Sequence, residues 1–442
     1  MTLEGEAIAR HGNYILFVSG AIPGEQALVE VVSIGPRYGR ARVLDIKHRS
    51  PFRVEPRCRH FGVCGGCSWQ HIEYAEQLRW KERLLRATLE HQLPDVYLPI
   101  RPMLGLDDPW ATRNKAQFLV CSDDRGRPAL GYYRAHSRDP VAVVECPVHH
   151  ATGNRVARSM LRLLDESGVP PQVENDRGGV ARHVMVRVAG SSNEALAVLV
   201  ASRPQFKGVQ EFGSKLMAAE PSVSGVHLNV NSRPGTVILG PETRKLAGRD
   251  RLVEEIAGVR FLISPLAFFQ TSSAAATRLV ETVLRFVPPM TAGPILDLYA
   301  GVGLFALPLA RRGHRVVAVE ENPHAVSDGI ESAKLNKITG CRFQSGKVES
   351  TVKRLARADA FDVVLFDPPR DGCPEWTLRM IARSIRPQRI IDVSCDPPAL
   401  ARDLAVLTRA GYRVREIQPI DMFPHTSHIE SVALLELSDR PR

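Results

Sequence analysis

The sequence predicts an α/β protein whose last third folds as a doubly wound, Rossmann-like parallel sheet. Two observations predict this fold. From about residue 271 to the C-terminus, short apolar runs alternate with helical patterns, which is typical of βαβ units. One of these runs, residues 294–299, leads into the turn Gly301-Val302-Gly303 and then a helix. A nucleoside cofactor docks at such a turn in a doubly wound sheet.

Seven strands are expected in this part of the chain, after a helix over about residues 271–286. The strands are expected at residues 294–299, 315–320, 341–345, 362–367, 389–394, 412–420 and 431–438. The stretch from Phe423 to His428 allows the last two strands to form an antiparallel ending. The glycine turn by itself is weak evidence for a cofactor, because it lacks the third glycine of a dinucleotide fingerprint.

A chain of 442 residues is too long for one core, and its patterns divide it into three parts. Residues 1–50 contain short alternating runs separated by turns, which predict a small OB-like β-barrel. Residues 51–265 form a central domain, with an amphipathic helix over 72–92 followed by a mixed, strand-rich pattern. Residues 266–442 contain the parallel sheet. The barrel strands are expected at residues 14–18, 27–32 and 40–44.

The net charge of +10 and the pI of about 9.4 favour a polyanionic partner, with nucleic acid first. In the barrel, phosphate contacts are expected from Arg37, Arg40, Arg42, Lys47 and Arg49. A solvated basic face that binds nothing is the alternative. No apolar run is long enough to cross a membrane, and the first residues do not read as a signal peptide. We therefore expect a cytoplasmic protein with no membrane partner and no obligate protein partner.

Three of the eight cysteines crowd into one short run, with the spacing C-x5-C-x2-C at Cys58, Cys64 and Cys67. In a reducing compartment such thiols are metal ligands or catalysts more often than disulfides. Cys146, which a proline follows, is the best candidate for a fourth ligand. The spacing alone supports an iron–sulfur centre and a zinc site about equally. Ordinary packed thiols are expected at Cys121, Cys341 and Cys373.

Cys395 is a lone thiol at the end of a predicted strand, in Val393-Ser394-Cys395-Asp396-Pro397. A thiol at that edge of the sheet would lie close to the cofactor and could attack a substrate. A buried structural cysteine is the alternative. Glu320, at the end of the second strand, is placed to accept hydrogen bonds from both ribose hydroxyls of a nucleoside. Asp367-Pro368-Pro369-Arg370 closes the fourth strand, where the target would face the cofactor.

In these residues and their order, the chain resembles the S-adenosylmethionine-dependent RNA uracil-C5 methyltransferases that carry an iron–sulfur cluster and an N-terminal TRAM barrel. A seven-stranded sheet with an antiparallel ending also suits a class I methyltransferase better than a dinucleotide dehydrogenase. The resemblance covers nearly the whole chain. It rests on the cysteine run 58–67 with Cys146, Phe268-Phe269-Gln270, Asp297-Leu298-Tyr299-Ala300-Gly301, Asp367-Pro368-Pro369-Arg370, Ser394-Cys395-Asp396-Pro397, and His425-Thr426-Ser427-His428-Ile429-Glu430.

The resemblance implies a role for each group of site residues. Cys395 is implied to be the nucleophile and Glu430 the base. The residues implied to bind S-adenosylmethionine are Gln270, Tyr299, Glu320 and Asp367. The residues implied to hold a 4Fe-4S cluster are Cys58, Cys64, Cys67 and Cys146. The N-terminal barrel is implied to bind RNA.

The chemistry explains why a thiol and a base are needed. Uracil C5 is a poor nucleophile until a thiolate adds to C6 and converts the ring to an enolate. We expect the Cys395 thiolate to be accessible near neutral pH. Asp396 would oppose this ionisation, so we expect its carboxylate to turn away or to pair with an arginine, with Arg370 as the candidate. Burial should raise the pKa of Glu430, which removes the C5 proton.

The target uridine has to leave its stack to reach Cys395, so single-stranded or opened RNA is the expected substrate. By family analogy 23S ribosomal RNA is the first choice, ahead of transfer RNA. Leu304 and Lys347 depart from the family pattern at contacts to the cofactor. The rival functions are a cytosine-C5 enzyme, which needs a cysteine near Asp367, and a catalytically inactive RNA-binding or redox-sensing protein.

Overall fold

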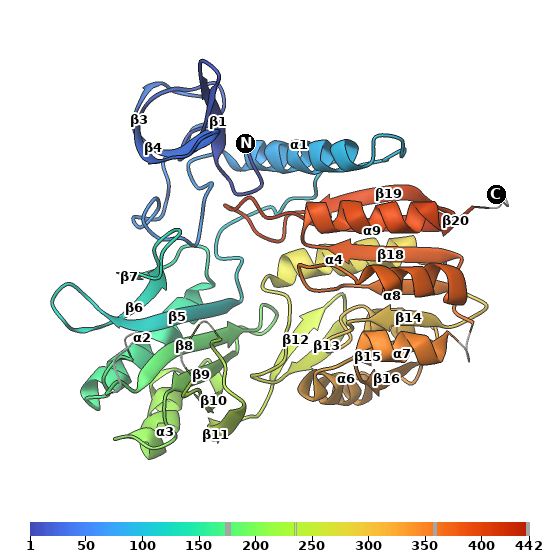
Figure 1. The fold of residues 1–442 in the computed structure, drawn as a ribbon. Coiled ribbons are helices and arrows are strands. Elements are labelled where there is room, and N and C mark those ends of the chain that lie inside the picture. The colour runs from blue at the N-terminus through green and yellow to red at the C-terminus, as the bar shows by residue number, and fades with distance from the viewer. Residues whose placement is uncertain (173–177, 234, 236, 357–359, 439–442) are drawn as a thin grey trace.

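A computed structural model describes residues 1–172, 178–233, 235, 237–356 and 360–438 of the chain. Three larger sheets follow one another along the sequence, with a two-stranded ribbon between the second and the third (Figure 1). The ribbon consists of β12 (Leu252–Ile256) and β13 (Val259–Ile263). The proposed borders at residues 50 and 265 stay predictions. None of the described helices is both long and apolar enough to cross a membrane.

The N-terminal sheet has four strands in the order β1-β2-β4-β3. Its strands are β1 (Ala7–His11), β2 (Tyr14–Ser19), β3 (Gln26–Ile34) and β4 (Tyr38–His48). The three expected strands are present as β2, β3 and β4, and β1 is an additional strand. Among the described residues β1 and β3 are not paired with each other, so the closed barrel stays a prediction.

Four of the five basic residues expected to contact phosphate pair with acids of the same region. The pairs are Arg40 with Glu6, Arg42 with Glu30, Lys47 with Asp45, and Arg49 with Glu55. Every one of these basic side chains is more than a third exposed. Exposed ion pairs of this kind contribute only about 0–1 kcal/mol, so they can open toward a phosphate backbone. The expected phosphate contacts stay a prediction.

The central part begins with helix α1 (Tyr74–Gln92) and continues into a mixed seven-stranded sheet in the order β11-β10-β9-β8-β5-β6-β7. Its strands are β5 (Lys115–Ser122), β6 (Pro128–Tyr133), β7 (Pro140–Ala142), β8 (Ala181–Val188), β9 (Ala195–Ala201), β10 (Val223–Val230) and β11 (Glu242–Gly248). Its helices are α2 (Ala151–Glu166) and α3 (Val209–Ala219). Both helices pack their apolar faces onto this sheet.

The C-terminal sheet confirms all seven predicted strands, in the order β16-β15-β14-β17-β18-β20-β19. The strands are β14 (Ile295–Leu298), β15 (Val316–Glu320), β16 (Cys341–Ser345), β17 (Val363–Phe366), β18 (Arg389–Ser394), β19 (Tyr412–Ile420) and β20 (Glu430–Leu437). Only β20 runs in the opposite direction to the other six strands, which gives the sheet the expected antiparallel ending. The strand order reverses between β14 and β17, so ligands are expected to bind at the carboxyl ends of these strands.

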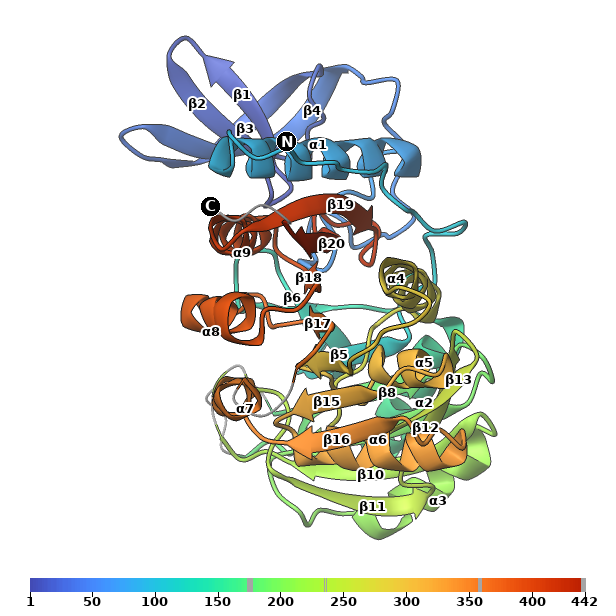
Figure 2. The ribbon, with the colours of Figure 1, turned by 90° about the vertical axis from the view of Figure 1, so that its right-hand side faces the viewer.

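Helices cover both faces of this sheet (Figure 2). One face carries α4 (Ser273–Phe286), α5 (Ala306–Arg311) and α6 (Pro323–Leu335). The other carries α7 (Val348–Leu355), α8 (Glu375–Met380) and α9 (Pro397–Arg409), with α1 lying against α9. Helix α1 therefore belongs to the same core as the C-terminal sheet, although it precedes the central sheet in the sequence.

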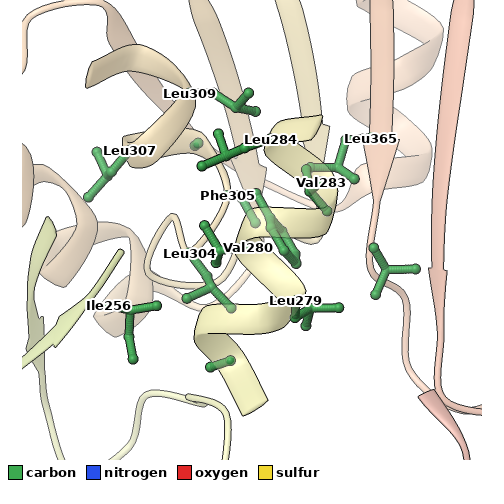
Figure 3. Packing of buried hydrophobic residues seen from close by; sticks show 14 of the residues in the cluster. Ile256, Leu279, Val280, Val283, Leu284, Leu304, Phe305, Leu307, Leu309 and Leu365 are labelled. Atoms are coloured by element: carbon green, nitrogen blue, oxygen red, sulfur yellow. The ribbon is translucent and has the colours of Figure 1, made fainter. Parts of the chain in front are cut away.

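Leu304 follows the glycine turn, at one of the two departures from the family pattern. Its side chain is buried in the apolar core between the sheet and α4, in one cluster with Ile256 and Val280 (Figure 3). Burying a leucine side chain contributes about 1.5–3 kcal/mol. Leu304 therefore contributes packing to the fold at this position.

The edge strand β19 is covered by a segment from the start of the central part. Ile100 bridges to Ile417 and Leu104 bridges to Ile420, both in the parallel sense. The backbone N–H of Leu104 donates to the carbonyl of Pro419 at 2.9 Å. Residues 99–104 therefore satisfy backbone groups that an open sheet edge would leave unpaired.

Candidate active site

The turn after β14 shapes the expected cofactor end of the site. Tyr299, Gly301 and Gly303 all have positive φ angles, of 59°, 56° and 86°. The Gly301 N–H donates to Glu320 Oε2 at 2.9 Å, and the Asn322 N–H donates to Oε1 at 2.7 Å. Two backbone donors thus hold the Glu320 carboxylate at the carboxyl end of β15. Each oxygen retains a lone pair for a further donor, such as a ribose hydroxyl.

Tyr299 lies beside an acid that the sequence analysis missed. Its hydroxyl donates to Glu349 Oε1 at 3.3 Å. Glu349 lies in the first turn of α7, two residues after Lys347. An acidic side chain therefore does follow the third strand of the sheet, displaced by two positions from the departure at Lys347. The sequence Lys347-Val348-Glu349 could have indicated this acid, because Glu349 lies only two positions after Lys347.

Gln270 lies in the connection between β13 and α4 and is buried. Its backbone carbonyl accepts a hydrogen bond from the Asn114 side chain at 3.1 Å. The same connection is tied to the end of β15, because the Asn322 side chain donates to the carbonyl of Leu266 at 3.3 Å. The neighbouring Phe268 is 66% exposed, which is unusual for so large an apolar side chain.

Strand register brings the predicted nucleophile and base together. Strands β18 and β20 pair antiparallel, with Ser394 opposite Ser431. One further step along both strands places Cys395 opposite Glu430. Asp367 follows β17, the parallel neighbour of β18, and its backbone N–H donates to the carbonyl of Leu298 at 3.3 Å. The thiol and two carboxyl groups therefore converge at the carboxyl edge of the sheet.

Burial dominates the electrostatics of this group. It raises the pKa of the Cys395 thiol to about 11, with smaller contributions from the charges of Glu430 and Asp367. Burial also raises the pKa of Glu430 well above its usual range, and Asp367 adds to this shift. Arg370 is the cation that opposes both shifts. The expectation of a thiolate near neutral pH is therefore wrong for the ligand-free protein, because carboxyl groups and burial surround the thiol.

A further buried acid interacts with Asp367. Asp392 lies on β18 with 0% exposure, and neither carboxyl oxygen has a hydrogen-bond partner among the described residues. Burial raises its pKa well above the usual range, followed by the charges of Asp403 and Asp367. Several acids in one poorly solvated region oppose one another's ionisation. Such a region favours a positively charged ligand.

Asp396 turns away from the thiol, as expected. Its carboxylate caps α9 by accepting the N–H of Ala399 at 3.0 Å. The alternative, a pair with Arg370, is not formed among the described residues. Arg370 Nη2 instead lies 3.0 Å from Nδ1 of His428, in the loop before β20. Because the backbone of α9 satisfies Asp396, Arg370 remains available to His428.

The four cysteines of the predicted cluster line one cavity of about 40 Å³, together with Arg113. The cavity joins the run 58–67 to Cys146, which precedes α2. Burial raises the pKa of the Cys146 thiol to about 12 and that of Cys64 and Cys67 above the usual range. The charge of Arg113 lowers the pKa of these three thiols. Arg113 stands in no motif that could have been recognised in the sequence.

The four thiols do not lie close enough together to bind one metal ion. Within the part of the chain that the structure describes, no three His, Cys, Asp or Glu side chains are grouped closely enough to hold one metal ion. A four-iron cluster takes one thiolate at each iron, so its four ligands stand farther apart than those of one zinc ion. Four thiols around one small cavity, with a cation beside them, fit the donor set of such a cluster.

The chain is similar to known RNA methyltransferases. Residues 255–438 match the family described as tRNA (Uracil-5-)-methyltransferase. An uncharacterized RNA methyltransferase of Halalkalibacterium halodurans is 35% identical over 99% of this chain and 96% of its own length. One from Gloeobacter violaceus is 35% identical over 98% of this chain and 94% of its own.

One solved structure extends the comparison to the cofactor. It is a Pyrococcus abyssi tRNA (uracil-54, C5)-methyltransferase in complex with S-adenosyl-L-homocysteine. It is 27% identical, covers 95% of this chain and 94% of its own, and superposes with a TM-score of 0.75. The chain therefore belongs to the RNA uracil-5-methyltransferase family and is an S-adenosylmethionine-dependent RNA methyltransferase.

Proposed function

We propose that this enzyme methylates C5 of one uridine in RNA, with Cys395 as the nucleophile and Glu430 as the base. The observation that carries the proposal is the register of β18 and β20, which sets the thiol opposite a buried carboxyl group. The thiol lies at the edge of the sheet where ligands of doubly wound folds bind. A purely structural cysteine would not need a buried acid across from it.

The proposed reaction has three steps on the RNA. The Cys395 thiol loses its proton to solvent, the thiolate sulfur bonds to C6 of the uracil, and the π-electron pair of the C5–C6 double bond moves onto the ring as an enolate. C5 then bonds to the methyl group as the bond between that methyl group and the cofactor's sulfonium sulfur breaks, and the cofactor would leave as the neutral thioether. Glu430 removes the proton from C5, the C5–C6 double bond forms again, and the bond from C6 to sulfur breaks. S-adenosylmethionine supplies the methyl group on a positively charged sulfur, and that charge would offset the carboxylates that hold the pKa of Cys395 high.

The cofactor is proposed to bind through Gln270, Tyr299, Glu320 and Asp367. Glu320 is the residue best placed for the ribose, because backbone donors already fix both of its oxygens. We expect Glu320→Ala to weaken S-adenosylmethionine binding by about 10- to 100-fold, the loss typical of a hydrogen bond to a charged group. Isothermal titration of the purified variant measures this change. The neighbouring exposed Glu321→Ala is the control, and equal losses in both variants would contradict the assignment.

The four cysteines are proposed to hold a 4Fe-4S cluster, with Arg113 beside it. A cluster bound by four thiolates carries negative charge, which a nearby guanidinium offsets. We expect Cys64→Ser to lower bound iron and acid-labile sulfide to less than about half of the wild-type content, because the cluster loses one ligand. Elemental and sulfide analysis after anaerobic purification measures both. Cys341→Ser should keep the wild-type content, whereas zinc without sulfide in the wild type would contradict the cluster.

The proposed substrate is ribosomal RNA of the large subunit, 23S RNA, by resemblance to the branch with a TRAM barrel and cluster. Transfer RNA is the second candidate, because the Pyrococcus abyssi structure is that of a tRNA (uracil-54, C5)-methyltransferase. The exposed ring of Phe268 beside Gln270 would be available to stack on an unpaired base.

The experiment that tests the function uses methyl-labelled S-adenosylmethionine with transcripts of 23S RNA and of transfer RNAs. After digestion to nucleosides, the label is expected in 5-methyluridine and mainly from the 23S transcript. Label mainly from transfer RNA would move the substrate to the second candidate. Label in any nucleoside other than 5-methyluridine would overturn the proposed reaction.

A further inference from the structure

We propose that helix α1 positions the loop that leads into Glu430, so that Gln77 and Lys81 act on the deprotonation step without touching the substrate. We call residues 421–429, between β19 and β20, the catalytic loop. This inference rests on the proposed role of Glu430 as the base. It assigns a role in the reaction to a helix more than 300 residues earlier in the chain.

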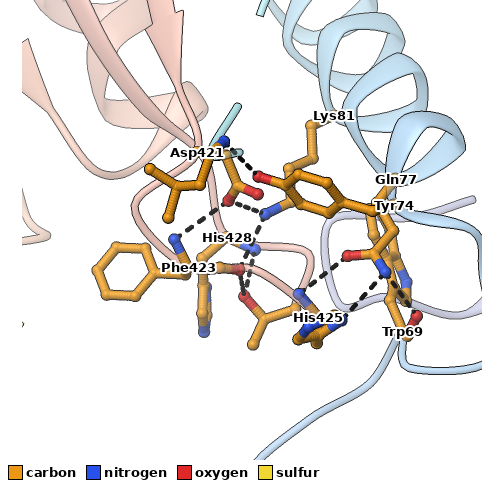
Figure 4. A network of polar contacts seen from close by, with 10 residues as sticks. Trp69, Tyr74, Gln77, Lys81, Asp421, Phe423, His425 and His428 are labelled. Carbon is orange, nitrogen blue, oxygen red and sulfur yellow. Dashed lines mark hydrogen bonds and ion pairs between the residues drawn. The ribbon is translucent and has the colours of Figure 1, made fainter. Parts of the chain in front are cut away.

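A buried ion pair fixes the beginning of the catalytic loop. Lys81 Nζ lies 2.6 Å from Asp421 Oδ1 and donates to the carbonyl of Phe423 at 3.0 Å (Figure 4). Both charged side chains have 0% exposure. Such a pair contributes little net stability compared with an apolar pair of the same size, because both charges lose their hydration. What it adds is one defined geometry for the backbone that it holds.

Gln77 fixes the middle of the loop through His425. Its Oε1 accepts the backbone N–H of His425 at 2.9 Å, and its Nε2 lies 3.2 Å from Nδ1 of the same residue. The φ of His425 is +64°, a conformation that a residue with a side chain adopts only when its surroundings impose it. The imidazole also stacks on Trp110, with ring centroids 3.8 Å apart. Gln77 thus holds a strained turn five residues before Glu430.

The segment directly after the cysteine run is hydrogen-bonded to His425 as well. The backbone N–H groups of Ser68 and Trp69 both donate to the carbonyl of His425, at 3.0 and 2.9 Å. Ser427 adds a bond from its hydroxyl to the carbonyl of Leu3 at 2.6 Å. Three separate N-terminal segments therefore converge on the catalytic loop.

The loop delivers the groups that surround the thiol. The residue that follows the loop is Glu430, opposite Cys395. Within the loop, His428 contacts Arg370, whose charge lowers the pKa of both Cys395 and Glu430. A proton transfer depends steeply on distance, and a misplacement of about 1 Å can cost about 100-fold in rate. Loosening the loop should therefore slow proton removal. It should leave the attack of Cys395, which β18 and α9 hold, nearly unchanged.

The test separates formation of the covalent RNA–protein adduct from release of the methylated RNA. The variants are Gln77→Ala and Lys81→Met, with Glu430→Gln as the reference. We expect both variants to form the denaturation-resistant adduct within about twofold of the wild-type rate and to release product about tenfold more slowly or worse. The adduct should then accumulate, as it does in the reference variant. Rapid quench followed by denaturing gel electrophoresis measures both rates.

The matched control is Leu85→Ala, in the same helix. Leu85 is fully buried in the core that α1 shares with α9, and it belongs to no contact with the catalytic loop given above. This variant should lower Tm without accumulating adduct. If Gln77→Ala and Lys81→Met lose adduct formation and release equally, or change only as Leu85→Ala does, the positioning role is wrong.

Two further outcomes keep the test decisive. If Lys81→Met does not fold, Ser427→Ala removes a single bond and should slow release by about threefold with normal adduct formation. Wild-type release in both Gln77→Ala and Ser427→Ala overturns the inference. If Glu430→Gln itself forms and releases product normally, the proposed base is wrong, and that result is distinct from a failure confined to the α1 variants.

Discussion

Replacing Cys395 by alanine is expected to abolish the release of tritium from RNA that carries tritium at uridine C5. Without the sulfur there is no nucleophile for C6, so C5 stays too weak to accept a methyl group. Removing the nucleophile of a covalent mechanism costs at least about 1,000-fold in turnover, and we expect a loss of that size. The measurement is cofactor-dependent tritium release by the wild type and by Cys395→Ala, with equal protein and RNA.

Cys341→Ala is the control, because its thiol lies on β16 and takes no part in the proposed reaction. It should retain tritium release within a few fold. Tritium release by Cys395→Ala at more than a tenth of the wild-type rate would assign the attack to another group. Methyl incorporation by the wild type without tritium release would place the reaction at an atom other than C5.

Glu430→Gln is expected to stop the reaction after methyl transfer, with the RNA still bonded to Cys395. A positioned general base typically contributes about 100- to 10,000-fold, and release of product should slow by that range. Mass spectrometry of the adduct should show one methyl group on the trapped uridine. Glu436→Gln, on the same strand but paired with Arg389 and Arg415, should behave as the wild type. An adduct without the methyl group would contradict the role.

The pH dependence of the release step follows from the raised pKa of Glu430. Burial and then Asp367 favour its neutral form, and the base must be ionised to act. Release should therefore accelerate as pH rises through the folded pKa and level off above it, and the glutamine variant should be flat. Because the folded pKa lies above the unfolded one, the stability from the neutral carboxyl is present below the unfolded pKa and is lost as pH rises through the folded pKa.

Local patterns in the sequence were sufficient for the C-terminal sheet. Most of its seven strands contain a short apolar run between turn residues, and such runs identify buried strands without knowledge of their neighbours. Strand β1 (Ala7–His11) was missed because only its first residue is buried, so no alternation is visible. The order of the central sheet depends on pairing between distant strands, which no local pattern encodes.

The candidate site also has features that the sequence predicts and features that arise only from tertiary contacts. Glu320 and Asp367 end predicted strands and Cys395 follows one, so a parallel sheet alone brings their backbones to one edge. The pKa of Cys395 was misjudged because burial and the charges of Glu430 and Asp367 arise only when the strands pair. The contact between Gln77 and His425 joins residues 348 positions apart, and neither segment carries a local signal for it.

The cover that residues 99–104 place over β19 has a consequence for the order in which the protein is made. Those residues are synthesised long before β19. Lys81 is likewise synthesised 340 residues before its partner Asp421. Contacts between such distant residues form slowly during folding. The edge of the C-terminal sheet that carries Glu430 is thus completed last, when β19 and β20 pack against the N-terminal segments that were synthesised earlier. A piece limited to residues 255–438 would keep the sheet but expose its β19 edge and leave the base unanchored.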